Sequence, residues 1–408
     1  MEKERIAIDL YILAFSLILL SIFLNNIKSS KSSIHPIANS FSVLNGNLSE
    51  FSKAKYSVYG FLPYWSIENS KYIQMDKLTE IAYFSLSIGA NGKITRILDD
   101  GAEEPGYTYW KKSKTLKDLI QKAKTNNVRV ALTVISHQDD VSEKFLNCQN
   151  CWKTFMKDLK SELNFHKISD VNLDFEHREL VDSTVADKYT QFIKYVKTEL
   201  GNEYKDSNVI VSSFADSFVK PRITKPKDIA KYADGLFIMA YDFNQPTSEN
   251  AGPVSPIGGA GAAQEYDIKT MLNDYIKNVP ASKLILGVPY YGYNWVVNSQ
   301  EPNAKRIVGD DLIGFSQSQY YSDIIDLALD YKIEPKWDEV GQNPFFNYIS
   351  NSTGSMRQVY YENPKSIKIK YAMAKERNLK GVGIWALGYD KGYQDLWNLL
   401  GEEFPRNK

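Results

Sequence analysis

Short runs of β-branched and aromatic residues recur along most of the chain, separated by stretches of helical periodicity. The runs that predict strands are 56–65, 81–88, 128–136, 171–176, 209–215, 235–243, 284–291 and 382–387. The stretches that predict helices include 110–126, 152–164, 183–200, 266–278 and 364–377. Strands that alternate with helices predict a parallel sheet, and eight such strands favour a closed α/β barrel, the (β/α)8 TIM barrel. No G-x-G-x-x-G follows the first predicted strand, which argues against a dinucleotide-binding fold.

The interval between the seventh and eighth predicted strands is too long for a simple connection. It carries a helical pattern over 316–331 and strand-like pieces over 333–337, 345–349 and 357–361. Because long structureless loops are uncommon in compact domains, this interval should fold. We therefore expect a small α+β insertion at about 296–378, within a barrel domain that covers 53–408.

Residues 6–24 are nearly all apolar. At about 1.5 Å per residue, a helix of this length just spans a hydrocarbon core of roughly 30 Å. A cleaved signal peptide and a transmembrane anchor both fit residues 1–27, and the absence of a small-residue cleavage pattern favours the membrane anchor. Residues 28–52 are rich in Ser, Asn and Lys and indicate a linker. The rest of the chain would then lie at the cell surface, either membrane-anchored or secreted.

The predicted strand 171–176 alternates strictly between apolar and polar residues. Successive strand side chains point to opposite faces, so Asn172, Asp174 and Glu176 share one face. The carboxyl groups of Asp174 and Glu176 should lie close together, and like charges at that distance do not ionise independently. An acid beside an ionised carboxylate is the arrangement that acid-catalysed glycoside cleavage uses. A D-x-E pattern is also common on the solvated face of an ordinary sheet, so the rest of the chain must decide.

Polar and aromatic residues gather where the predicted strands end. Barrels of this kind carry their active sites at the C-terminal ends of the strands. The residues at these ends are Tyr64 and Trp65, Asp174 and Glu176, Asp216, Met239, Tyr241 and Asp242, Tyr290, Tyr291 and Trp295, and Trp385. Aromatic residues make up 13% of the chain, and such rings can stack on the apolar faces of sugars. The 49 basic and 49 acidic residues balance, which leaves no electrostatic footprint for nucleic acid.

The two cysteines, Cys148 and Cys151, form a single C-x-x-C pattern. A zinc site would need two further ligands, and the chain has only 4 His, none at ligand spacing nearby. A small loop disulfide or two unpaired thiols remain as interpretations. We expect neither a metal site nor a cofactor.

Motifs on several predicted strands resemble those of glycoside hydrolase family 18, the chitinase-like barrels. The fourth-strand motif of that family, D-x-x-D-x-D-x-E, reads here from Ser169 to Glu176, with Ser169 and Asn172 in place of the first two acids. The sixth-strand M-x-Y-D is present at 239–242, and the seventh-strand G-x-P-x-Y-G-x-x-W at 287–295. The third-strand S-x-G-G is absent, and His137 stands in that region. The chain looks closest to the spore and cell-wall lytic branch of the family.

The resemblance implies hydrolysis of β-1,4 bonds in N-acetylglucosamine-containing polymers, either peptidoglycan or chitin. Glu176 would be the general acid and later the base, and the substrate's own 2-acetamido group would replace a protein nucleophile. Asp174 would orient the acetamido N–H, and Tyr241 would bind the acetamido carbonyl. The residues expected to bind the sugar are Asn172, Asp242, Met239, Trp385, Tyr64, Tyr291 and Trp295. Tyr241 and Trp385 also fit as ordinary core residues.

A non-catalytic lectin on the same barrel is the alternative function. Such lectins usually lack the acid, whereas Glu176 is retained here. His177 follows the acid and should face the opposite side of the strand, which favours a structural role.

Overall fold

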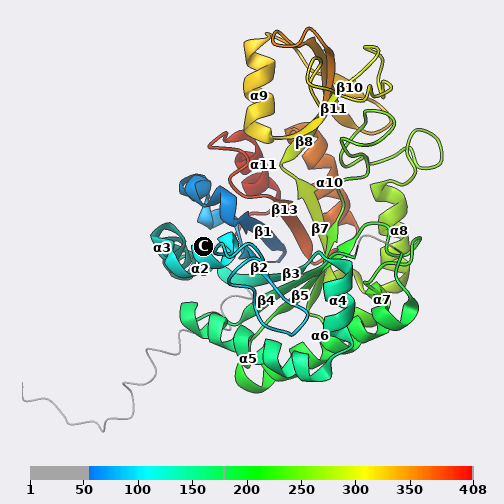
Figure 1. Ribbon diagram of the computed structural model, residues 1–408. Coiled ribbons are helices and arrows are strands. Elements are labelled where there is room, and N and C mark those ends of the chain that lie inside the picture. The colour runs from blue at the N-terminus through cyan, green and yellow to red at the C-terminus, as the bar shows by residue number, and fades with distance from the viewer. Residues whose placement is uncertain (1–54, 178–179, 407–408) are drawn as a thin grey trace, which may run out of the picture. The chain divides into compact units, whose positions relative to one another are not determined.

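Eight parallel strands close into a barrel in the order β1-β13-β7-β6-β5-β4-β3-β2 (Figure 1). Their bounds are β1 Ser57–Pro63, β2 Glu80–Ser87, β3 Arg129–Ser136, β4 Asp170–Phe175, β5 Val209–Phe214, β6 Gly235–Met239, β7 Leu284–Pro289 and β13 Gly381–Trp385. β1 pairs with both β2 and β13, so the barrel is closed without an edge. Each observed strand lies at one of the predicted strand positions, and the prediction of a TIM barrel is confirmed.

The computed structural model describes residues 55–177 and 180–406. The predicted anchor at 1–27 and the predicted linker at 28–52 lie outside this part of the chain. Among the described residues, no helix has both the length and the apolar character needed to cross a bilayer.

Two apolar layers hold the strands in place. Inside the barrel, the aromatic rings of Tyr59, Phe61 and Phe237 pack together, with ring centroids of Phe61 and Phe237 4.8 Å apart. Outside, the alternate strand residues pack under the helices, as Leu173 and Phe175 of β4 do at 0% and 1% exposure. The alternation of β4 therefore buries its apolar face and leaves Asn172, Asp174 and Glu176 to the interior of the barrel.

Helices cover the outside of the barrel (Figure 1). Their bounds are α2 Pro105–Lys112, α3 Lys114–Thr125, α4 Asp139–Leu146, α5 Gln149–His166, α6 Ser183–Glu203, α7 Pro226–Ile229, α8 Ile268–Asn278, α10 Pro364–Glu376 and α11 Asp395–Glu403. The single helix predicted over 110–126 is two helices. Ser113 breaks it, because its backbone is extended and its side chain accepts a hydrogen bond from the Leu116 N–H, which caps α3.

A five-stranded antiparallel sheet is inserted between β7 and α10, in the order β10-β11-β12-β8-β9. Its strands are β8 Tyr291–Val296, β9 Gln317–Tyr320, β10 Lys336–Asp338, β11 Asn343–Ile349 and β12 Met356–Tyr360, and its helix is α9 Tyr321–Asp330. The predicted helix 316–331 was wrong over its first turn, because residues 317–320 pair with β8 instead. Gly292 permits the close approach of β12, since a side chain there would meet the Tyr360 carbonyl oxygen at 2.3 Å.

Candidate active site

Asp174 and Glu176 lie at the C-terminal end of β4 and line a cavity of about 690 Å³ at the mouth of the barrel. The Glu176 N–H donates to the Ser136 carbonyl at 3.0 Å, which holds the ends of β3 and β4 together. The Asp174 side chain is 4% exposed and that of Glu176 is 31% exposed. One carboxyl is therefore shielded, while the other can reach a bound substrate.

His137, the first residue after β3, lies beside both carboxyls. Its Nε2 is 3.6 Å from Glu176 Oε1 and 3.8 Å from Asp174 Oδ2. Because active sites of such barrels lie at the C-terminal ends of the strands, His137 could have been predicted as a site residue from its position alone. In the sequence, His137 stands out only as a departure from a family motif.

Tyr241 lies just beyond the end of β6 and lines the same cavity as the acid pair. Burial, followed by the negative charges of Asp174 and Glu176, raises the pKa of the Tyr241 phenol well above its usual value. Since a raised pKa keeps the neutral form, the hydroxyl stays protonated and can donate a hydrogen bond throughout the pH range of an assay.

Asp242 has a left-handed backbone conformation, with φ 61°. This turns its carboxylate toward the hydroxyls of Tyr291 and Tyr293, which both donate to Oδ1, the second at 2.6 Å. Burial raises the pKa of Asp242 despite these two hydrogen bonds. Tyr291 and Tyr293, which follow β7, therefore hold the carboxylate of Asp242 at the edge of the cavity.

Trp385 ends β13 and forms an aromatic wall of the cavity. Its ring packs edge-on against Phe84, with centroids 4.7 Å apart, and near Phe61 at 5.5 Å. Trp65, which is 45% exposed, lies 6.5 Å from Trp385. A half-buried indole held on one side by other rings leaves its other side available for stacking on a sugar.

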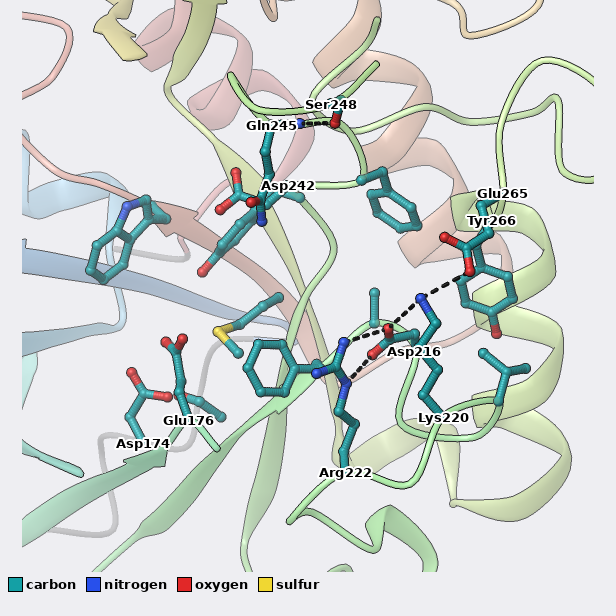
Figure 2. A pocket seen from close by; sticks show the side chains of 18 of the residues that line it. Asp174, Glu176, Asp216, Lys220, Arg222, Asp242, Gln245, Ser248, Glu265 and Tyr266 are labelled. Atoms are coloured by element: carbon teal, nitrogen blue, oxygen red, sulfur yellow. Dashed lines mark hydrogen bonds and ion pairs between the residues drawn. The ribbon is translucent and has the colours of Figure 1, made fainter. Parts of the chain in front are cut away.

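Charged side chains line the other side of the cavity, away from Asp174 and Glu176 (Figure 2). Arg222 binds Asp216 with two hydrogen bonds, of 2.9 and 2.7 Å. Lys220 Nζ lies 2.9 Å from the carboxylate of Glu265, which is 78% exposed. Lys220, Arg222 and Glu265 were not predicted, because they lie in loops after the strand ends, where no motif marks them.

The remaining predicted sugar-binding residues differ in position. Met239 lines the cavity, whereas Asn172 is fully buried beneath it and accepts a hydrogen bond from Ser212 Oγ at 3.3 Å. Tyr64 is not among the cavity-lining residues, because β1 ends at Pro63 and the following 3-10 helix places its ring 6.0 Å from that of Tyr109.

Two aromatic residues predicted to bind sugar lie behind the cavity wall. Tyr291 is 5% exposed and binds Asp242 through its hydroxyl. Trp295 is fully buried, and its Nε1 donates to the carbonyl oxygen of Gln245, a cavity-lining residue, at 3.2 Å. Both therefore contact residues that line the cavity instead of lining it themselves.

Among the described residues, the ligand atoms of His137, Asp174 and Glu176 lie within 4.8 Å of one another. That spacing would admit a cation. We assign none, because acidic groups often gather at protein surfaces without a bound ion. Cys148 and Cys151 form a disulfide at the start of α5, which decides between the two interpretations of that pair.

Comparison with known proteins places these observations in a wider context. The sequence profile described as "Glycosyl hydrolases family 18" matches residues 57–390. The "Cortical fragment-lytic enzyme" of Bacillus anthracis is 25% identical over 317 residues, covering 73% of this chain and 66% of that protein. The "Di-N-acetylchitobiase" of Mus musculus is 27% identical over 255 residues, covering 56% of this chain and 66% of that protein. The chain thus spans just under two thirds of the length of these two relatives.

The fold has solved counterparts. The spore cortex-lytic enzyme SleL of Bacillus megaterium QM B1551 aligns with a TM-score of 0.66 at 20% sequence identity, covering 88% of this chain and 76% of that one. At this level of identity the likeness concerns the fold alone.

Proposed function

Because this chain belongs to the glycosyl hydrolases of family 18, we propose that it cleaves β-1,4 bonds in N-acetylglucosamine-containing polymers with the substrate's own 2-acetamido group as nucleophile. One observation carries the proposal: Asp174, Glu176, Tyr241 and Trp385 line a single cavity at the C-terminal ends of the barrel strands. Its volume of about 690 Å³ suits a sugar chain held beside the acid.

In the first step, Glu176 gives its proton to the glycosidic oxygen and the bond to the anomeric carbon breaks. The acetamido carbonyl oxygen attacks that carbon and closes a positively charged ring. Tyr241 donates to this carbonyl oxygen and holds it in position for attack. Asp174 accepts from the acetamido N–H and stabilises the positive charge of the ring.

In the second step, water attacks the anomeric carbon and the ring reopens. Glu176, now a carboxylate, takes the proton from that water, which restores the acid. Two displacements at the same carbon retain its configuration.

The charged side of the cavity favours peptidoglycan over chitin. Chitin is uncharged along its length, whereas the lactyl and peptide groups of peptidoglycan carry carboxylates and amines. Lys220 and Glu265, whose ion pair is exposed at the cavity, offer charges of both signs to such groups (Figure 2). The cortex-lytic names of some relatives are consistent with this choice.

We place the enzyme outside the cytoplasm, held by the apolar segment 6–24 or released after its cleavage. The disulfide between Cys148 and Cys151 supports this location, since such bonds persist in oxidising compartments. Protease treatment of intact cells should remove the protein, and its complete protection inside cells would contradict the placement.

The direct test is Glu176→Gln, assayed side by side on chitooligosaccharides and on purified peptidoglycan. Loss of a general acid costs on the order of a hundred- to ten-thousandfold in rate. Binding of the oligosaccharide should survive, because the amide has nearly the shape of the carboxyl. Glu199→Gln is the matched control, since Glu199 lies on α6 and pairs with Lys160 outside the cavity.

Two outcomes would contradict the proposal. If Glu176→Gln turned over substrate at the wild-type rate, Glu176 could not be the general acid. Binding without turnover by the wild-type protein on either glycan would leave the lectin as the better account.

The preference for peptidoglycan has its own test in Lys220→Glu. Because an exposed ion pair is worth about 0.2–1 kcal/mol, the ratio of kcat/KM on peptidoglycan to that on chitooligosaccharide should fall by up to about fivefold. An unchanged ratio would favour chitin as the substrate.

A further inference from the structure

The imidazole of His137 stands between the two carboxyls and has no part in the mechanism described above. Its Nε2 is 3.6 Å from Glu176 Oε1 and 3.8 Å from Asp174 Oδ2. The backbone hydrogen bond from Glu176 N–H to the Ser136 carbonyl fixes the two strand ends next to each other. Phe84 limits the ring on one side, with centroids 6.3 Å apart. The position of His137 is therefore set by the barrel.

The negative charge of the acid pair grows during the first step. Once Glu176 has given up its proton, two anions lie close together, and one of them, Asp174, is almost fully buried. Asn172 shares their face of β4, yet its Nδ2 makes no hydrogen bond to Asp174 or to any other described residue. The imidazole offers an N–H that lies near both carboxylates at once.

We propose that His137 is a positioning residue, whose Nε2–H orients the Glu176 carboxyl and stabilises the carboxylate that forms when the proton leaves. This inference rests on the proposed function of Glu176. The present distances lie slightly beyond a hydrogen bond, and catalytic hydrogen bonds of this kind often shorten only when substrate is bound. Asp174 Oδ2 lies on the other side of the same nitrogen, 3.8 Å away, so one imidazole faces both carboxyls.

The role predicts effects on rate and on pH dependence together. A hydrogen bond to an ionised group is worth about ten- to a hundredfold in an equilibrium or a rate, so its loss should lower kcat by that factor. A donor favours the ionised acid, so its removal raises the pKa of Glu176 and moves the alkaline limb of the rate profile to higher pH. Tyr241 and Arg222, which also sense the charge of Glu176, are unchanged in the variants compared.

The experiment compares His137→Gln with His137→Asn in the full-length protein. A Gln amide can reach the position of Nε2 and keep the donor, whereas an Asn amide is one carbon shorter. His166→Gln and His166→Asn are the controls, because His166 ends α5 and its ring bonds to the Trp110 carbonyl at 2.8 Å. Each variant is assayed for kcat, KM and pH profile on a chitooligosaccharide, with thermal denaturation to verify folding.

We expect the Gln variant to retain at least about ten times the kcat of the Asn variant, since the hydrogen bond to a charged group is kept in one and lost in the other. KM should change little in either, and the alkaline limb of the Asn variant should move upward. Equal kcat values for the two variants would overturn the role of His137, as would a change confined to KM. The wild-type protein and Glu176→Gln are assayed alongside. Equal turnover by these two proteins would refute the proposed function itself, whereas a loss in Glu176→Gln together with equal His137 variants would refute only the role of His137.

Discussion

Tyr241→Phe tests the second half of the proposed chemistry, the fixing of the acetamido carbonyl. The substitution removes one hydroxyl and keeps the ring, which packs edge-on against Tyr291 with centroids 6.2 Å apart. Burial, followed by the negative charges of Asp174 and Glu176, raises the pKa of the Tyr241 hydroxyl and keeps it protonated. It is therefore available as a donor at every pH at which Glu176 works.

The magnitude follows from the site. The hydroxyl would point at an oxygen whose charge changes during the reaction, in a cavity partly closed to water. Removing one such donor costs about 10²–10³ in kcat, or ~2.7–4 kcal/mol. A buried tyrosine with only a structural role would instead cost about 0.5–1.5 kcal/mol of folding stability and leave kcat alone.

The assay is kcat and KM on a fluorogenic chitooligosaccharide, with unfolding in urea as the stability measurement. Tyr189→Phe is the matched control, because Tyr189 is fully buried behind β4 and its hydroxyl lies 3.5 Å from the Leu173 carbonyl. A Tyr241→Phe enzyme with a kcat within about threefold of wild type would refute the reasoning, since the expected loss is far larger.

Three further predictions concern the cavity and the packed outer face of β4. Trp385→Ala should lower kcat/KM by about fivefold or more, since the stacking of a nucleic-acid base on an aromatic side chain is worth ~1–3 kcal/mol and a sugar ring should behave similarly. An unchanged kcat/KM in steady-state kinetics would mean that the ring is only part of the core. Asp242→Asn should stabilise the protein more at pH 7 than at pH 4: the pKa of Asp242 is raised on folding, so its ionised form destabilises the fold above that pKa and ceases to do so as the pH falls through it. Urea midpoints at the two pH values measure this, and an equal gain at both would contradict the linkage. Leu173→Ala should cost ~2–5 kcal/mol of unfolding free energy, because Leu173 is fully buried between β4 and the helices, and a loss below about 1 kcal/mol would mean that this face of β4 is not packed as described.

The sequence was sufficient to predict most of the barrel and the family, and the reason lies in particular residues. Strict alternation over 171–176 set both the burial of Leu173 and the direction of Glu176, since a strand has only two faces. Because active sites of such barrels lie at strand ends, Tyr241 and Trp385 could be predicted to lie near Glu176. All three line one cavity. The match of residues 57–390 to the family profile confirms the resemblance drawn from these motifs.

Other features depended on contacts between distant parts of the chain. Ser113 ends one helix and caps the next, which periodicity alone does not reveal. Residues 317–320 form a strand because β8 lies beside them, whatever their helical spacing. Tyr64 and Trp295 carry the residue types of a sugar site, yet packing turns the first toward Tyr109 and buries the second.

The central claim is that one acylated amino sugar takes part in its own cleavage beside Glu176. Two oligosaccharides with the same fluorogenic leaving group, one bearing 2-acetamido groups and the other 2-hydroxyl groups, test it most directly. The account predicts turnover of the first and none above background for the second. Comparable kcat/KM values for the two substrates would contradict it.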